Sequence, residues 1–226
     1  TITAYAQGDP GESCTWVRYR LSNTSSRAAS GRFFLAVRPV QINPSWQFGG
    51  MSPIRALSIT QTPAGCEAQI DGATCYLSLT APEAFGVQAF DQGDVVQVLA
   101  RGEVPSAHAL RQDDGLLSGA LAYDFSLEPG AIKDAVVVAP LHPGRVPADT
   151  ADADAAFKKG LAAVRELWRE QLGRATIGLT DADLADTARA QLAYMLVNKD
   201  NDALQPGSRH YEISWIRDGS VISAAL

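Results

Sequence analysis

Cysteine and histidine are scarce in this chain. Its 226 residues include three cysteines and three histidines, and no two cysteines stand in a Cys-x-x-Cys pair. Zinc sites are built from closely spaced cysteine and histidine ligands. The sequence therefore argues against a metal site, and we expect no cofactor either.

Long apolar runs and an excess of basic residues are also missing. No run approaches the roughly 20 apolar residues that cross a bilayer, so we expect no membrane partner. The formal net charge is -6, whereas a surface that binds nucleic-acid phosphates has to be basic. We therefore expect no nucleic-acid partner.

With 46% hydrophobic residues, the chain can build a full core, and its length allows two domains.

Two of the cysteines, Cys66 and Cys75, flank an Asp-Gly turn signal at 71–72. A two-residue turn would place Cys66 opposite Leu77, and a four-residue loop over 69–72 would place it opposite Cys75. Apolar surroundings favour two buried thiols, and a disulfide between them stays open as the alternative.

The first 145 residues carry the pattern of short β-strands. Apolar and polar side chains alternate in several runs, as in strands with one buried face, and turn residues separate these runs. Many short strands of this kind are typical of an antiparallel β-sandwich. The segments that we predict as strands are 16–21, 33–38, 56–60, 73–79, 95–100, 116–127 and 135–139.

After residue 145 the apolar period changes from two residues to 3.6, which predicts helices at 151–172 and 181–197. Asp149 or Thr150 can cap the first helix, and the Thr-Asp-Ala-Asp sequence from Thr180 resembles a capping box. The first helix carries an apolar stripe, and we expect its residues Phe157, Leu161, Val164 and Trp168 to pack on protein. This stripe consists of Phe157, Leu161, Val164, Trp168 and Leu172.

These changes divide the chain into three parts. We predict a β-sandwich domain at 1–145, a linker helix at 146–180 and the start of a helical domain at 181–226. Strands followed by helices in this way give an α+β fold that is mainly β. The chain starts without Met and stops within a predicted helix over 220–226, so we expect an excerpt of a longer protein.

The segment from 203 to 220 combines aromatic, basic and acidic side chains between two predicted helices. Tyr211, Trp215, Arg217 and Asp218 stand there in the pattern Tyr-x-x-x-Trp-x-Arg-Asp. An aromatic ring stacks on the apolar face of a sugar, while an arginine fork and a carboxylate bind hydroxyls. We therefore predict a sugar-binding site. In the competing interpretation Trp215 is a core residue, Arg217 pairs with an acid and Asp218 caps a helix.

This pattern resembles a motif between the first two barrel helices of glucoamylase-like glycoside hydrolases, which have an (α/α)6 six-hairpin barrel. Bacterial members carry an N-terminal super-sandwich and a linker helix before the barrel, the order that we predict here. The resemblance implies that 181–226 begins the barrel and that Tyr211, Trp215, Arg217 and Asp218 line the subsite for the terminal glucose. It also implies an inverting enzyme for glucoside-like oligo- or polysaccharides, exported to the periplasm or the cell exterior.

The same resemblance places the catalytic acid and base on later barrel segments, beyond Leu226. Glu212 and Asp218 stand in one loop, and nothing indicates the carboxyl separation of roughly 6.5–9.5 Å that inversion needs. We therefore assign no catalytic residue within the chain. It would supply sugar-binding residues, depend on the remainder of its own barrel, and be inactive alone.

Two other functions stay open. The chain could be a non-catalytic carbohydrate-binding or packing module, with Trp46 and Phe48 as its exposed aromatic residues. It could also be the front part of a glycoside phosphorylase, in which phosphate replaces water as the nucleophile. After Leu226, two suitably placed glutamates would support hydrolysis, one glutamate with a phosphate loop would support phosphorolysis, and neither would support the binding module.

Overall fold

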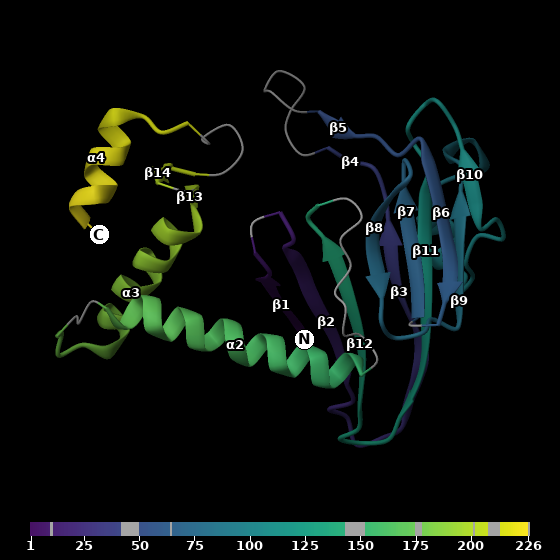
Figure 1. The fold of residues 1–226 in the computed structure, drawn as a ribbon. Helices are drawn as coiled ribbons and strands as arrows, with labels where there is room; N and C mark the ends of the chain where they lie inside the picture. Colours follow the sequence, from purple (N-terminus) through teal and green to yellow (C-terminus); the bar gives the residue numbers. More distant parts are fainter. Residues whose placement is uncertain are drawn as a thin grey trace. The chain divides into compact units, whose positions relative to one another are not determined.

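The chain is mainly β, with antiparallel sheets followed by helices, as predicted (Figure 1). The chain divides into two compact units, Thr1–Val164 and Arg165–Leu226, and the boundary between them falls within helix α2 (Ala153–Gly173). The division at 145 and 180 stays a prediction. The computed structural model describes residues 1–9, 11–41, 50–63, 65–142, 152–174, 178–200, 202–207 and 213–225.

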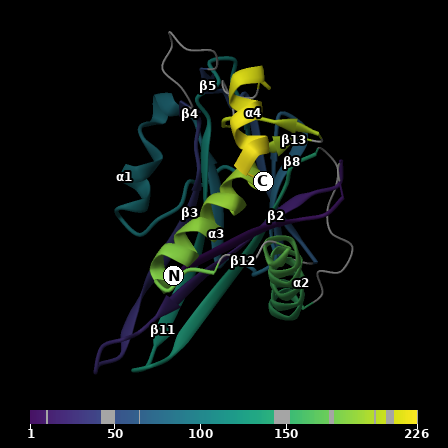
Figure 2. The same cartoon turned by 90° about the vertical axis from the view of Figure 1, so that its left-hand side faces the viewer.

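The larger sheet of the first unit has seven strands in the order β1-β2-β12-β8-β7-β6-β10, and all its neighbours pair antiparallel. Its two longest strands, β2 and β12, run side by side over nine residues each (Figure 2). In chain order the strands are β1 (Ile2–Gln7), β2 (Cys14–Ser22), β6 (Ala56–Thr62), β7 (Gly65–Ile70), β8 (Ala73–Ser78), β10 (Ala109–Arg111) and β12 (Ile132–Pro140).

The smaller sheet has the order β3-β11-β9, and β11 pairs antiparallel with both neighbours. Its strands are β3 (Ala29–Val37), β9 (Ala84–Gln88) and β11 (Ser118–Leu127). A separate short pair consists of β4 (Val40–Gln41) and β5 (Met51–Ser52).

The main core joins the two sheets. Leu121 and Tyr123 of β11 pack in one buried cluster with Leu57 and Ile59 of β6. Successive side chains of a strand point to opposite faces of its sheet. The larger sheet therefore has a second apolar face, on which β12 places Val136 and Val138.

The first turns of α2 cover that second face. Phe157 is fully buried in a cluster that includes Tyr5 and Trp16. Leu161 and Val164 are half-buried against the same cluster. The predicted packing is therefore confirmed for these three residues of α2 and stays a prediction for Trp168.

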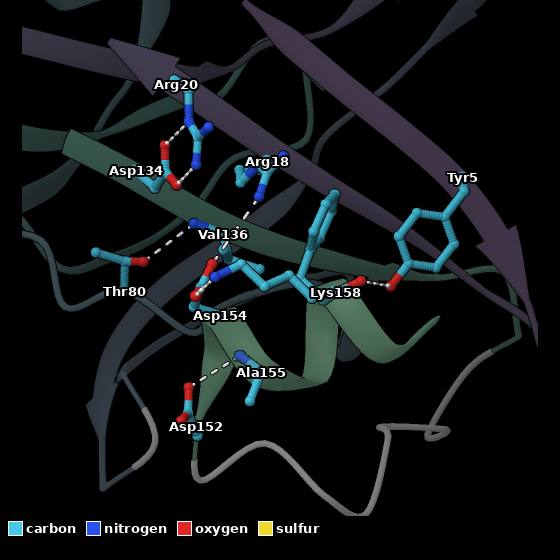
Figure 3. A network of polar contacts seen from close by, with 11 residues as sticks. Tyr5, Arg18, Arg20, Thr80, Asp134, Val136, Asp152, Asp154, Ala155 and Lys158 are labelled. Atoms are coloured by element: carbon cyan, nitrogen blue, oxygen red, sulfur yellow. Dashed lines mark hydrogen bonds and ion pairs between the residues drawn. The ribbon is translucent and has the colours of Figure 1, made fainter. Parts of the chain in front are cut away.

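Polar contacts also hold α2 to the sheet (Figure 3). Tyr5 donates a hydrogen bond from Oη to the carbonyl oxygen of Phe157 at 3.0 Å. Arg18 lies 3.9 Å from the Asp154 carboxylate, and its guanidinium carbon lies 4.7 Å from the centroid of the Phe157 ring. At the start of the helix, Asp152 accepts a hydrogen bond from a backbone N–H of the first turn at 3.0 Å.

One predicted strand is wrong. Segment 95–100 forms the short helix α1 (Val95–Leu99), which follows the 3-10 turn η1 (Phe90–Gln92). Asp94 caps α1, because its side chain accepts a hydrogen bond from the Val96 N–H at 3.0 Å. This local cap outweighs the β preference of the valines, which depends strongly on the surrounding sheet.

The hairpin of β7 and β8 has neither of the two registers considered for the cysteines. The turn at 71–72 has two residues with positive φ, 51° and 85°, as in tight type I′ hairpins. A β-bulge then shifts the pairing, so that Cys66 lies opposite Ser78 and not opposite Leu77 or Cys75. Cys66 is a buried free thiol, so it forms no disulfide, and burial raises its pKa to about 11.

The helix starts differ slightly from the predicted ones. Helix α3 (Ala182–Val197) is capped by Asp181, whose side chain accepts two backbone hydrogen bonds, and not by Thr180. Asp149 and Thr150 lie outside the described residues.

None of the described helices has the length and apolar composition that a bilayer crossing requires.

Candidate functional site

The predicted site lies at the start of the last helix, α4 (Ile216–Ala225), in the second unit. A short hairpin of β13 (Lys199–Asp200) and β14 (Ala203–Leu204) follows α3. Ser214 donates a hydrogen bond from Oγ to the carbonyl oxygen of Leu204 at 3.2 Å. This contact attaches the segment before α4 to the hairpin.

A pocket of about 390 Å³ is lined by one face of α3 and one face of α4. Gln205 and Pro206 complete its wall. Residues three or four positions apart lie on the same face of a helix, and both sets of lining residues follow this spacing. They are Gln191, Tyr194, Met195 and Asn198 of α3, and Arg217, Asp218, Val221 and Ile222 of α4.

Arg217 and Asp218 therefore lie at one pocket, and their role in binding a sugar stays a prediction. Arg217 donates a hydrogen bond from Nη2 to Oδ2 of Asp218 at 3.0 Å. The Arg217 side chain is 82% exposed and that of Asp218 is 25% exposed. An exposed ion pair stabilises a protein by only about 0–1 kcal/mol. The contact with Asp218 also uses only one of the five guanidinium N–H donors of Arg217. Both groups can therefore exchange this contact for contacts with a ligand.

The structure agrees with one part of the competing interpretation, in which these residues have only structural roles. Arg217 does pair with an acidic neighbour, Asp218. Asp218, however, lies within the first turn of α4, which begins at Ile216, and not at the cap position before it. Trp215 is 38% exposed and is therefore no core residue.

The structure does not bring all four predicted residues together. Trp215 directly precedes α4 and does not occur among the described residues that line the pocket. Tyr211 lies outside the described residues, as do Glu212 and the segment 42–49 with its two aromatic residues.

The sequence analysis predicted only Arg217 and Asp218 among the lining residues. Those that it missed include four with polar groups: Gln191, Tyr194, Asn198 and Gln205. Three of them stand at positions i, i+3 and i+7 of α3. The sequence shows that these three residues share one face of a helix, and this spacing could have indicated a site. Polar residues on one face of a helix, however, normally indicate that this face is exposed to solvent. Only the opposing face of α4 turns that side into a pocket wall.

No family model matches the chain, and no curated protein matches it either. The assignment of the pocket depends on its own residues and chemistry. Within the described part of the chain, no group of three or more histidine, cysteine, aspartate and glutamate residues could hold a metal ion.

Clear pKa shifts occur in the first unit and have structural causes. Hydrogen bonds from the Arg20 guanidinium lower the pKa of the Asp134 carboxyl on the neighbouring strand. Hydrogen bonds from Arg32 lower the pKa of Asp124 in the same way. These carboxylates are held in their charged form by cross-strand ion pairs, so they do not indicate a catalytic acid.

Proposed function

We propose that this chain is the front part of a glycoside hydrolase and that the pocket of α3 and α4 binds a sugar residue of a glucoside-like oligo- or polysaccharide. One observation carries the proposal. Arg217 and Asp218 line a single pocket together with amide side chains and an aromatic residue.

The lining suits the two kinds of surface that a sugar presents. Its hydroxyls need partners to replace the hydrogen bonds that they lose to water. Arg217 is a permanent donor, Asp218 an acceptor, and Gln191, Asn198 and Gln205 can do both. The apolar face of the sugar ring can pack on Tyr194. The volume also lies within the range of roughly 300–1,000 Å³ that is usual for small-molecule pockets.

The order of elements supports the same plan. In this proposal the two sheets form a super-sandwich, α2 is the linker helix, and α3 and α4 begin an (α/α)6 barrel. The proposal assigns no catalytic acid or base within the chain, which supplies binding residues to the remainder of its barrel. Export to the periplasm or the cell exterior belongs to the same proposal.

The test uses the intact protein that contains this chain, with maltotriose, isomaltotriose and cellotriose as substrates. We expect glucose to be released in the absence of phosphate, first as the inverted anomer, which NMR detects. Arg217→Lys should lower kcat/KM by about tenfold or more, because lysine keeps the charge but cannot fork onto two hydroxyls.

The outcomes separate the candidate functions. Release of a sugar phosphate that requires inorganic phosphate would identify a phosphorylase. Binding of these sugars without cleavage would identify a carbohydrate-binding module. If the protein neither binds nor cleaves any of the three sugars, the proposed function is wrong.

A further inference from the structure

A second pocket, of about 830 Å³, opens on the first unit, on strands β6, β7 and β10. Its floor includes Ala56, Ser58 and Ala109, which alternate along their strands with the core residues Leu57 and Leu110. These small side chains therefore lie on the face opposite the main core. Because these side chains are small, they leave space above this face of the sheet. The larger side chains at the rim surround that space.

Two arginines at this pocket, Arg55 and Arg111, have no carboxylate partner within the described part of the chain. Most other described arginines, such as Arg20 and Arg32, do form ion pairs. Arg111 lies opposite Ala56 in the pairing of β10 with β6. Ala56 directly follows Arg55 in the chain. The pocket therefore gathers two positive charges that are unpaired among the described residues, one at the end of β10 and one directly before β6, in a protein whose net charge is -6.

Asp71 is held in place at the rim. Its Oδ1 accepts hydrogen bonds from the backbone N–H groups of Arg55 at 3.2 Å and Ala56 at 2.7 Å. Its own N–H donates to the carbonyl oxygen of Ala56 at 2.9 Å. This part of the wall is therefore ordered before a ligand arrives, which reduces the entropy cost of binding.

The charges at the pocket favour a particular class of ligand. Among the lining residues, two guanidinium groups and one carboxylate leave a single net positive charge, which suits a monoanion better than a phosphate dianion. Arginine forks match the geometry of a carboxylate. Ser58 offers a hydroxyl, and Gln69 keeps an amide oxygen after its Nε2 donates to Glu67 at 3.0 Å. Both can bind ligand hydroxyls.

We propose that this pocket binds a hydroxylated monocarboxylate of the uronic-acid class, with the carboxylate between Arg55 and Arg111 and the hydroxyls toward Ser58 and Gln69. The volume has space for a whole molecule of this kind and not only for an ion. Every residue involved belongs to the first unit, so the inference does not depend on the proposed function of the pocket at α3 and α4.

The test is isothermal titration calorimetry of the 226-residue chain with glucuronate, with glucose as the neutral counterpart and inorganic phosphate as the dianion. We expect glucuronate to bind with a dissociation constant on the order of 1 mM. At this pocket glucose and phosphate should each bind at least about tenfold more weakly than glucuronate, and added salt should weaken glucuronate binding.

The variants are Arg55→Gln combined with Arg111→Gln, and Arg27→Gln as the control. Arg27 is an exposed arginine elsewhere on the first unit. The double variant should lose glucuronate binding by at least about tenfold while its melting temperature stays unchanged, and Arg27→Gln should bind as the parent chain does. The proposal is overturned by glucose binding as tight as that of glucuronate that the double variant abolishes, by tighter binding of phosphate, by no loss in the folded double variant, or by absence of glucuronate binding. Glucose binding that persists in the double variant is assigned to the pocket at α3 and α4.

Discussion

At the scale of single residues, the first unit is stabilised by contacts between side chains far apart in the sequence. Arg20 and Asp134 lie directly opposite each other in the pairing of β2 with β12. Arg20 donates from Nε to Oδ1 of Asp134 at 2.8 Å and from a second nitrogen to Oδ2. The sequence shows both charges, but their pairing appears only when the sheet order is known.

This pair gives the first testable prediction, a pH dependence of Asp134→Asn. The Arg20 guanidinium lowers the pKa of the Asp134 carboxyl, so the pair stabilises the fold above the ordinary aspartate pKa of about 3.9. That contribution is lost as the pH falls through the lowered pKa. We expect the substitution to cost about 1 kcal/mol at neutral pH and progressively less in acid. Urea unfolding at neutral and acidic pH measures both, and a pH-independent difference would contradict the explanation.

A second prediction concerns Gly160, at the contact of α2 with the sheet. A Cβ atom here would collide with the side-chain oxygens of Tyr5 and Gln7. Alanine favours helix by about 1 kcal/mol over glycine, yet Gly160→Ala should destabilise the protein by about 1–3 kcal/mol through overpacking. Gly173→Ala is the control, because a Cβ at this position of α2 meets nothing within 4 Å. Equal melting temperatures of the two variants would show that the helix does not pack this closely.

At the scale of elements, long periodic segments were predicted well and short ones were not. The predicted helix over 151–172 corresponds to α2, because five apolar residues mark one face. Strand β10 has three residues, too few to show a period, and its pairing with β6 comes from a distant part of the chain. Segment 95–100 became a helix because Asp94 caps it locally.

The buried face of α2 gives the third prediction. Phe157 is fully buried, so Phe157→Ala should cost about 3–5 kcal/mol of the free energy of unfolding. Leu161 is only half-buried against the same cluster, so Leu161→Ala should cost about 2 kcal/mol, the lower end of its range. Leu167→Ala is the control, since this leucine is 54% exposed. Denaturant unfolding measures the free energy of unfolding of the three variants. Similar losses for Leu161→Ala and Leu167→Ala would contradict the packing of the Leu161 side of α2 on the sheet.

At the scale of the whole molecule, the order of strands followed by helices was predictable, while the candidate site was predictable only in part. Arg217 and Asp218 were found by residue type and spacing. Gln191 and Asn198 were not, because they become pocket residues only when α4 faces them. A pocket formed by two helices is a property of tertiary packing, which no local pattern contains.

The measurement that tests the central claim most directly compares Asp218→Ala with Asp183→Ala in the intact protein. Both aspartates lie in the first turn of a helix, where a negative charge stabilises by about 0.3–1 kcal/mol. Only Asp218 lines the pocket. Both variants should therefore lose similar, small amounts of thermal stability.

Their activities on the best-cleaved glucose oligosaccharide should differ. Loss of a charged hydrogen bond to the sugar should lower kcat/KM of Asp218→Ala by at least about 10²-fold, while Asp183→Ala should keep the activity of the parent protein. If Asp218→Ala instead melts early and retains its specific activity, Asp218 only stabilises its helix, and the sugar-binding assignment of the pocket is contradicted.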